Sequence, residues 1–142
     1  MTNTENNTSN GSRERAVVYV RVSSKKQAEE GVSIAAQIER AKAYATIKEF
    51  AVSDEDVFVD DGVSASIPLW ARPAGKELNS HIHDEGIRHI IAVKMDRLFR
   101  DVQDLLSTVD ELRKEETDLH LLEYNGATLD TSSAMGRFFL TV

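Results

Sequence analysis

The sequence contains no cysteine, only two prolines and a single tryptophan among its 142 residues. Without cysteine the chain has no disulfide framework, no cysteine-based zinc site and no thiol nucleophile. No apolar run approaches the roughly 20 residues that a membrane span requires. The first thirty residues also lack the basic and then apolar order of a secretory signal. We therefore expect a cytoplasmic protein without a membrane partner.

Positive charge is scarce as well. The 17 lysines and arginines are outnumbered by 24 aspartates and glutamates, which gives a formal net charge of −7. Such an acidic chain is a poor non-specific binder of nucleic acid, so any contact with DNA must come from a local basic patch. The length is that of one globular domain.

The order of apolar segments predicts an α/β domain. Residues 1–14, rich in asparagine, threonine and serine, are expected to form a disordered tail, and residues 15–142 a single domain. Apolar, β-branched runs predict strands at residues 16–20, 57–59, 90–93 and 119–122, and apolar residues at helical spacing predict helices at 34–48, 74–84 and 102–112. We expect a mostly parallel sheet of four to five strands, flanked by helices.

The connections carry further signals. The two prolines of residues 64–73 predict a loop without regular structure. After an Asn-Gly turn at 125–126, Thr131 or Ser132 is expected to open a last helix. Because the sequence stops near the second or third turn of that helix, we expect a domain truncated at the start of a long C-terminal helix.

Motifs for several common chemistries are absent. No G-x-G-x-x-G follows the first strand, and neither a G-x-x-x-x-G-K-[ST] phosphate loop nor a G-x-S-x-G nucleophile elbow occurs. His81 and His83 are two residues apart on a helix and so point to different sides, and His89 and His120 have no second histidine at helical spacing. We predict no metal site and no cofactor, and expect solvated or half-buried histidines.

One polar cluster follows the first predicted strand. Tyr19, Arg21 and Ser23 share one face of that strand, so that a cation and a hydroxyl emerge together at its carboxyl end. A loop serine beside an ordinary surface arginine would show the same pattern.

A second cluster follows the third strand. Arg97 and Arg100 are three residues apart at the start of a helical turn, where free backbone N–H groups also favour an anion. The alternative is a solvated charge run, in which Asp96 and Asp101 neutralise the two arginines.

Together the two clusters favour a phosphodiester as the substrate. They follow neighbouring strands of a parallel sheet and should meet at one edge of it. Guanidinium groups bind a phosphodiester and stabilise the negative charge that its oxygens gain during attack. A serine beside several arginines can therefore act on such a bond without a metal ion.

Six segments of the chain resemble, in order, the catalytic domain of the serine recombinases, and most closely that of the phage-type large serine integrases. They are Y-x-R-V-S-S at 19–24, GVSIAAQ at 31–37, D-x-G-x-S at 60–64, R-P at 72–73, K-x-D-R-L-x-R at 94–100 and TSSAMG at 131–136. The resemblance runs from about residue 15 to residue 142. It implies a resolvase-like α/β fold and a site-specific DNA recombinase.

The resemblance also implies roles for individual residues. Ser23 would attack a DNA phosphodiester to leave a 5′-phosphoserine link and a free 3′-hydroxyl, and the reverse attack would rejoin strands without metal or ATP. Asp96 would orient an arginine or take part in proton transfer to the leaving oxygen. Arg97 and Arg100 match the pair that contacts the scissile phosphate, Arg21 matches the arginine that neighbours the nucleophile, and Arg72 matches another active-site arginine, on the loop after the second strand. The supporting positions are those of Gln27, Gln37, Lys94 and Tyr19.

Partners follow from the same resemblance. The family uses separate DNA-binding domains, missing from this chain, to reach specific attachment sites, and it assembles into dimers and tetramers. We therefore expect the full-length protein to bind DNA and to self-associate. Ala71 departs from the family pattern, in which an acidic residue commonly precedes the Arg-Pro pair.

Three alternatives stay open at this stage. Ser24 is a rival for the nucleophile. A non-catalytic α/β regulatory module could use Asp60 and Asp61 to hold a cation or accept a phosphoryl group. A DNA endonuclease would cut the same bond without rejoining it.

Overall fold

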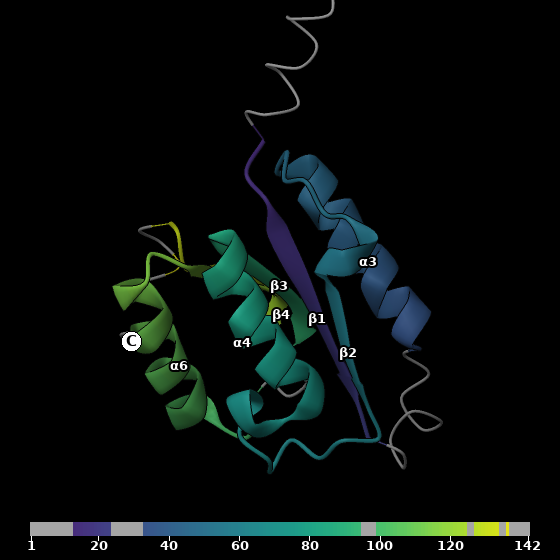
Figure 1. The fold of residues 1–142 in the computed structure, drawn as a ribbon, viewed down its shortest axis with the longest axis vertical. Helices are drawn as coiled ribbons and strands as arrows, with labels where there is room; N and C mark the ends of the chain where they lie inside the picture. The colour runs from purple at the N-terminus through teal and green to yellow at the C-terminus, as the bar shows by residue number, and fades with distance from the viewer. Residues whose placement is uncertain (1–12, 24–32, 95–98, 125–126, 134–135, 137–142) are drawn as a thin grey trace, which may run out of the picture.

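The computed structural model describes residues 13–23, 33–94, 99–124, 127–133 and 136 (Figure 1). Five strands form one sheet in the order β2-β1-β3-β4-β5. The first four are parallel, and β5 runs antiparallel to β4, which confirms the predicted mostly parallel α/β fold. The strands are β1 (Ala16–Val22), β2 (Val57–Asp61), β3 (His89–Lys94), β4 (Asp118–Tyr124) and β5 (Ala127–Asp130).

Three helices cover the two faces of the sheet. Helix α3 (Ile34–Ile47) lies on one face, and α4 (Pro73–Glu85) and α6 (Val102–Lys114) lie on the other (Figure 1). Short 3₁₀ turns precede β2 at Asp54–Asp56 and α4 at Leu69–Ala71. Within the described ranges, none of the helices is long and apolar enough to cross a membrane.

Each helix begins where the sequence supplies a suitable first residue. The Ser33 hydroxyl accepts a hydrogen bond from the Ala36 amide at 3.0 Å, and the Asp101 carboxylate caps α6 in the same way. Pro73 is the first residue of α4, where a missing N–H removes no helical hydrogen bond. The expectation that residues 64–73 lack regular structure is therefore wrong at their C-terminal end.

The chain after β4 also differs from the expectation. The sequence predicts no strand between the turn at 125–126 and the last helix, yet residues 127–130 form β5. Thr131 and Ser132 lie in a turn, and it is the Ser133 hydroxyl that accepts a hydrogen bond, at 2.9 Å, from the Gly136 amide three residues on. Four residues with one buried side chain give too short a pattern to predict a strand.

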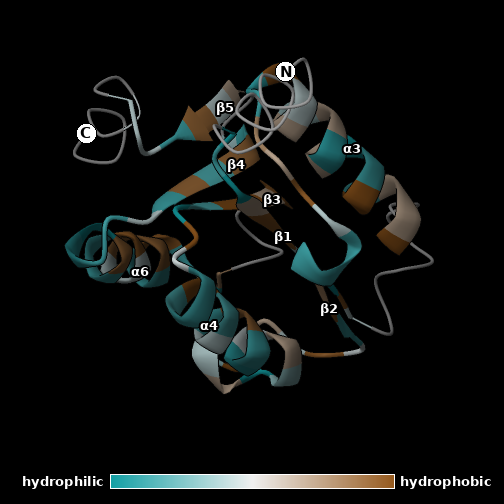
Figure 2. Cartoon of the chain, turned by 45° about the horizontal axis from the view of Figure 1, so that its top comes forward, coloured by the Kyte–Doolittle hydropathy of each residue, from teal (hydrophilic) through white to brown (hydrophobic). Residues whose placement is uncertain are grey.

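The core occupies both faces of the sheet, and β1 is buried along its whole length. Figure 2 shows apolar residues on the strands and on the sides of the helices that face them. The predicted apolar stripe of α6 packs into this core through Leu105, Val109 and Leu112, whereas Val102 is 47% exposed.

Two of the four histidines depart from the expected solvated or half-buried state. His89 is 6% exposed and His120 is 0% exposed. His89 has a carboxylate neighbour 75 residues away, Glu14, and His120 lies opposite Asp130 of the next strand. Spacing along the sequence does not show such neighbours.

Candidate active site

The predicted nucleophile lies at the carboxyl end of the central strand. Ser23 is half-buried and directly follows β1, which pairs with β2 on one side and with β3 on the other. In an open α/β sheet, ligands bind outside the carboxyl ends of the strands, at the strand whose two neighbours are reached by connections on opposite faces of the sheet. The carboxyl ends of the neighbouring parallel strands β1 and β3 thus lie at the edge of the sheet where a ligand is expected.

Arg21 is buried rather than displayed on the surface. It is 4% exposed, and its Nη1 donates a hydrogen bond of 2.8 Å to the Val63 carbonyl. Arg21 lies opposite Asp60 in the parallel register of β1 and β2. The guanidinium of Arg21, which precedes the nucleophile by two residues, therefore holds the segment that follows β2.

A buried network connects β1, β2 and the start of α4. The Tyr19 hydroxyl donates to Asp60 Oδ2 at 2.7 Å and accepts from Arg72 Nη1 at 3.1 Å. Burial raises the pKa of Tyr19, so that the phenol keeps its proton and can act as the donor. Tyr19 thus lies between a carboxylate and a guanidinium, all of them almost inaccessible to solvent.

Arg72 takes part in this network as a fully buried side chain. Its Nε donates to the Ile67 carbonyl at 2.8 Å, and its Nη2 approaches the Ala65 carbonyl at 3.4 Å. Its exposed fraction is 0%. In this arrangement the guanidinium holds the chain between β2 and α4 instead of facing outward.

Asp60 is the residue whose role the sequence motif did not define. It is 2% exposed and, besides the Tyr19 hydroxyl, accepts the backbone amides of Ala74 at 2.8 Å and Gly75 at 3.2 Å. It therefore satisfies free N–H groups in the first turn of α4, next to Arg72. The signal in the sequence is a carboxylate two residues after Phe58, on the face of β2 that points into the core.

Gly75 permits a close contact at the same place. A Cβ atom there would lie 1.8 Å from the Leu69 carbonyl oxygen, so only glycine lets α4 pack against the preceding 3₁₀ turn. The contact keeps Arg72, which lies between these two elements, in a fixed position.

The second cluster begins at the end of β3, next to β1. Lys94 is the last residue of β3, with its Nζ 3.5 Å from Glu123 Oε2 on β4. Arg100 lies at the surface just before α6, with its Nε 3.6 Å from Asp101. The other predicted site residues, Asp96, Arg97 and Gln27, and the rival serine Ser24, lie outside the described residues.

Gln37 is buried in an unusual way. It lies in the first turn of α3 and is 0% exposed. Neither its side-chain oxygen nor its nitrogen has a hydrogen-bond partner among the described residues. An unsatisfied buried amide costs about 1–3 kcal/mol, and no hydrogen bond among the described residues offsets that cost at Gln37.

Known proteins resemble the chain in both sequence and structure. The sequence family described as "Resolvase, N terminal domain" matches residues 16–142. A "Putative DNA recombinase" of Bacillus subtilis is 37% identical over 102 residues, which are 72% of this chain and 19% of that protein. The "DNA-invertase hin" of Salmonella typhimurium is 42% identical over 53 residues, 37% of this chain and 26% of that protein. The chain thus spans a fifth to a quarter of these relatives.

Two solved structures share the fold. The N-terminal catalytic domain of TP901-1 integrase has a TM-score of 0.75 and 38% identity, covering 90% of each chain. A resolvase family site-specific recombinase from Streptococcus pneumoniae has a TM-score of 0.68 at 23% identity, covering 91% of this chain and 84% of that one, which supports the fold alone. The chain belongs to the resolvase family, and residues 16–142 form the catalytic domain of a serine recombinase.

Proposed function

We propose that this domain cleaves and rejoins DNA at specific sites through Ser23. The observation that carries the proposal is the position of Ser23 just beyond the central strand, two residues after the buried Arg21. This strand lies next to β3, after which Arg97 and Arg100 follow in the sequence. A hydroxyl among guanidinium groups suits attack on an anionic diester.

The reaction conserves the phosphodiester energy. The Ser23 oxygen forms a bond to phosphorus while the bond from phosphorus to the 3′ oxygen breaks. The serine gives up one proton and the 3′ oxygen gains one, so that a 5′-phosphoserine and a free 3′-hydroxyl result. The reverse attack by a 3′-hydroxyl after strand exchange restores the DNA and the serine.

The residues of the chain would share the work around the phosphate. Arg97 and Arg100 would bind its non-bridging oxygens, and their charge would take the place of a metal ion or nucleotide cofactor. Asp96 would orient one of these arginines or move the proton to the leaving oxygen. Gln37, which is 0% exposed and has no partner among the described residues, would supply an amide only after the chain around it rearranges.

Asp60 does not fit the role that a regulatory module would give it. A phosphoryl acceptor must be accessible, whereas this carboxylate is 2% exposed and accepts three hydrogen bonds from within the fold. This excludes Asp60 as the acceptor but not Asp61, which is exposed at the end of β2, and it is the family match that favours the enzyme.

The test uses the full-length protein that contains this chain, on DNA that it is first shown to bind. Denaturing gels of wild type, Ser23→Ala and Ser24→Ala should show a covalent DNA–protein adduct in the first and the third only. Equal melting temperatures of the two variants would serve as the control for folding.

The other outcomes are equally informative. An adduct that survives Ser23→Ala and disappears in Ser24→Ala would move the nucleophile to Ser24. Cut DNA ends without attached protein would replace the recombinase with an endonuclease. If the wild type and both variants bind the DNA but none forms a covalent adduct with it, the serine mechanism is overturned.

A further inference from the structure

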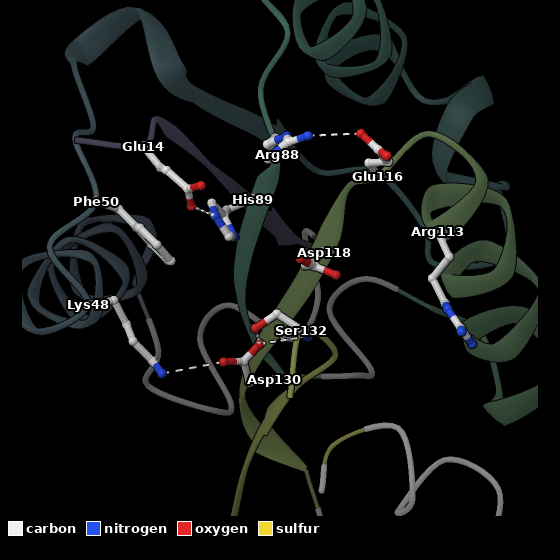
Figure 3. Close-up of a pocket in the computed structure, with 10 residues that line it drawn as sticks. All are labelled: Glu14, Lys48, Phe50, Arg88, His89, Arg113, Glu116, Asp118, Asp130 and Ser132. Carbon is white, nitrogen blue, oxygen red and sulfur yellow. Dashed lines mark hydrogen bonds and ion pairs between the residues drawn. The ribbon is translucent and has the colours of Figure 1, made fainter. Parts of the chain in front are cut away.

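Two histidines are buried together at the opposite end of the sheet from Ser23. Nδ1 of His89, at the start of β3, lies 3.0 Å from Nε2 of His120 on β4. The Phe50 ring stacks on His89 with 4.0 Å between centroids and so shields the pair on one side. His89 lines a pocket of about 670 Å³, shown in Figure 3. No step of the proposed DNA chemistry uses these groups.

The two outer nitrogens of the pair are bonded as well. Nε2 of His89 is hydrogen-bonded to the Glu14 carboxylate, in the segment that leads into β1. Nδ1 of His120 lies 2.7 Å from the Tyr44 hydroxyl of α3 and 3.4 Å from Asp130 Oδ1 at the end of β5. A continuous chain of polar groups thus runs from Glu14 to Asp130.

Other charged groups surround this chain. Lys48, the residue that follows α3, contacts Asp130, with Nζ and Oδ2 3.4 Å apart, and Arg88 pairs with Glu116 at 2.8 Å (Figure 3). The remaining charged side chains that line the pocket are those of Arg113 and Asp118. In the described parts of the chain, no three His, Asp or Glu side chains are arranged to hold a metal ion.

Hydrogen-bond roles determine the tautomers when both histidines are neutral. A carboxylate only accepts, so Nε2–H of His89 must donate to Glu14 and Nδ1 of His89 must accept. His120 then donates from Nε2 to His89, and its Nδ1 accepts from the Tyr44 hydroxyl. Every donor in this row of polar groups then has an acceptor, but the Asp130 carboxylate faces Nδ1 of His120, which carries no proton.

One added proton reverses the order without breaking the chain. His89 as imidazolium donates from both nitrogens, which requires His120 to accept at Nε2 and to carry its own proton on Nδ1. That N–H points to Asp130 and Tyr44, so a repulsive contact with the carboxylate becomes an attractive one. A second proton would place two N–H groups face to face at 3.0 Å.

The titration of the end groups agrees with a single proton. Burial lowers the pKa of His120 to about 4, although Asp130 acts in the opposite direction, and His89 and Lys48 add to the lowering. The hydrogen bond from His89 lowers the pKa of Glu14. Burial thus opposes a proton on both rings at once. At the other end burial opposes ionisation of Asp130, but hydrogen bonds from Ser132 and the charge of His120 outweigh it and lower the pKa of Asp130.

Asp130 connects the pair to the turn that follows β5. Its Oδ1 accepts from the Ser132 amide at 2.9 Å and from the Ser132 hydroxyl at 2.5 Å. Its backbone carbonyl accepts from the Ser133 hydroxyl, which in turn caps Gly136. A change in the attraction between His120 and Asp130 thus reaches the start of the next helical segment.

We propose that His89 and His120 form a one-proton switch, in which protonation of His89 changes the tautomer of His120 and thereby strengthens the hold on Asp130 and the turn at 131–133. The switch is independent of the proposed chemistry at Ser23.

Nuclear magnetic resonance of the chain with ¹⁵N-labelled histidine tests this directly. As the pH is lowered, His120 should change from the Nε2–H to the Nδ1–H tautomer in the same step in which His89 becomes imidazolium. The amide signals of Ser132 and Gly136 should move with the midpoint of that step. His83, an exposed histidine on α4, provides an internal reference. A single tautomer of His120 throughout, or simultaneous formation of two imidazolium rings, would overturn the switch.

Two variants should move the midpoint in opposite directions. Tyr44→Phe removes the donor that stabilises neutral His120 and should raise the midpoint, whereas Asp130→Asn removes the charge that attracts the added proton and should lower it. Each shift should be about half a unit to one unit. Glu116→Gln, which lines the same pocket but bonds to Arg88, should leave the midpoint unchanged. Shifts of the same sign in the two variants, or no shift, would contradict the mechanism. If a variant does not fold, the tautomer change in the wild-type protein still tests the switch.

Discussion

Replacing Asp60 by alanine should destabilise the domain more than any comparable change at the surface. The carboxylate is 2% exposed and accepts three hydrogen bonds, from the Tyr19 hydroxyl and from the amides of Ala74 and Gly75. Alanine leaves all three donors buried without an acceptor. It also removes the group that satisfies the first turn of α4.

The magnitude follows from these contacts. Each hydrogen bond to a charged group contributes about 1.5–3 kcal/mol. The loss is smaller than three such bonds because the variant no longer pays to bury a carboxylate, so the expected decrease in the free energy of unfolding is about 3–5 kcal/mol. In a domain of this size that lowers the melting temperature by roughly 10–20 °C.

Urea unfolding at pH 7, with linear extrapolation to water, measures the decrease. Asp61→Ala is the matched control, since this neighbouring carboxylate is exposed at the end of the same strand. It should change the free energy of unfolding by less than about 0.5 kcal/mol. A loss below about 1 kcal/mol for Asp60→Ala, or an equal loss for the two variants, would refute the network as an anchor of α4.

Three further changes test other parts of the molecule. Gln37→Leu removes a buried amide without a partner among the described residues, so it should raise the free energy of unfolding by about 1 kcal/mol while slowing DNA cleavage; a less stable variant would contradict this. Asp56→Asn should be less stable than wild type at pH 7, and the difference should shrink below about pH 4 in urea titrations. Burial opposes ionisation of Asp56, but hydrogen bonds from His81, Ser53 and Arg15 outweigh it and lower its pKa. Stability that depends on such a carboxylate is present above its unfolded pKa and is lost in acid; a constant difference would disprove it. Arg97→Ala should slow single-turnover cleavage by about 10- to 150-fold without weakening DNA binding to the same degree, and an equal loss of both would mean that Arg97 only binds.

Much of the fold could be predicted because its signals are local. A strand buried on both faces appears as a continuous apolar run, as in β1 and β3, and a helix begins at a residue such as Ser33 whose side chain can accept the free amides. The strand β5 could not be predicted, because four residues with one buried side chain match neither the helical nor the strand pattern.

The sequence indicates the residue types of the candidate site, whose roles stay a prediction, and does not indicate their contacts. The apolar run at residues 16–20 predicts a strand just before Ser23, and the structure confirms that strand as β1. The bonds of Tyr19 with Asp60 and Arg72 join residues 41 and 53 positions apart. No spacing rule connects such distant residues, and the same holds for the histidine pair.

The burial of Arg72 has a consequence for the proposed chemistry. A guanidinium with no exposed surface cannot contact a DNA phosphate in the arrangement described, since it is held by the Tyr19 hydroxyl and by the carbonyls of Ala65 and Ile67. To reach the phosphate it must exchange at least part of this set for the diester oxygens. The free energy needed to break these contacts of Arg72 then offsets part of the transition-state stabilisation that its guanidinium provides. A small effect of Arg72→Ala on the cleavage rate would therefore be compatible with direct contact in the transition state, provided that the same variant also loses stability.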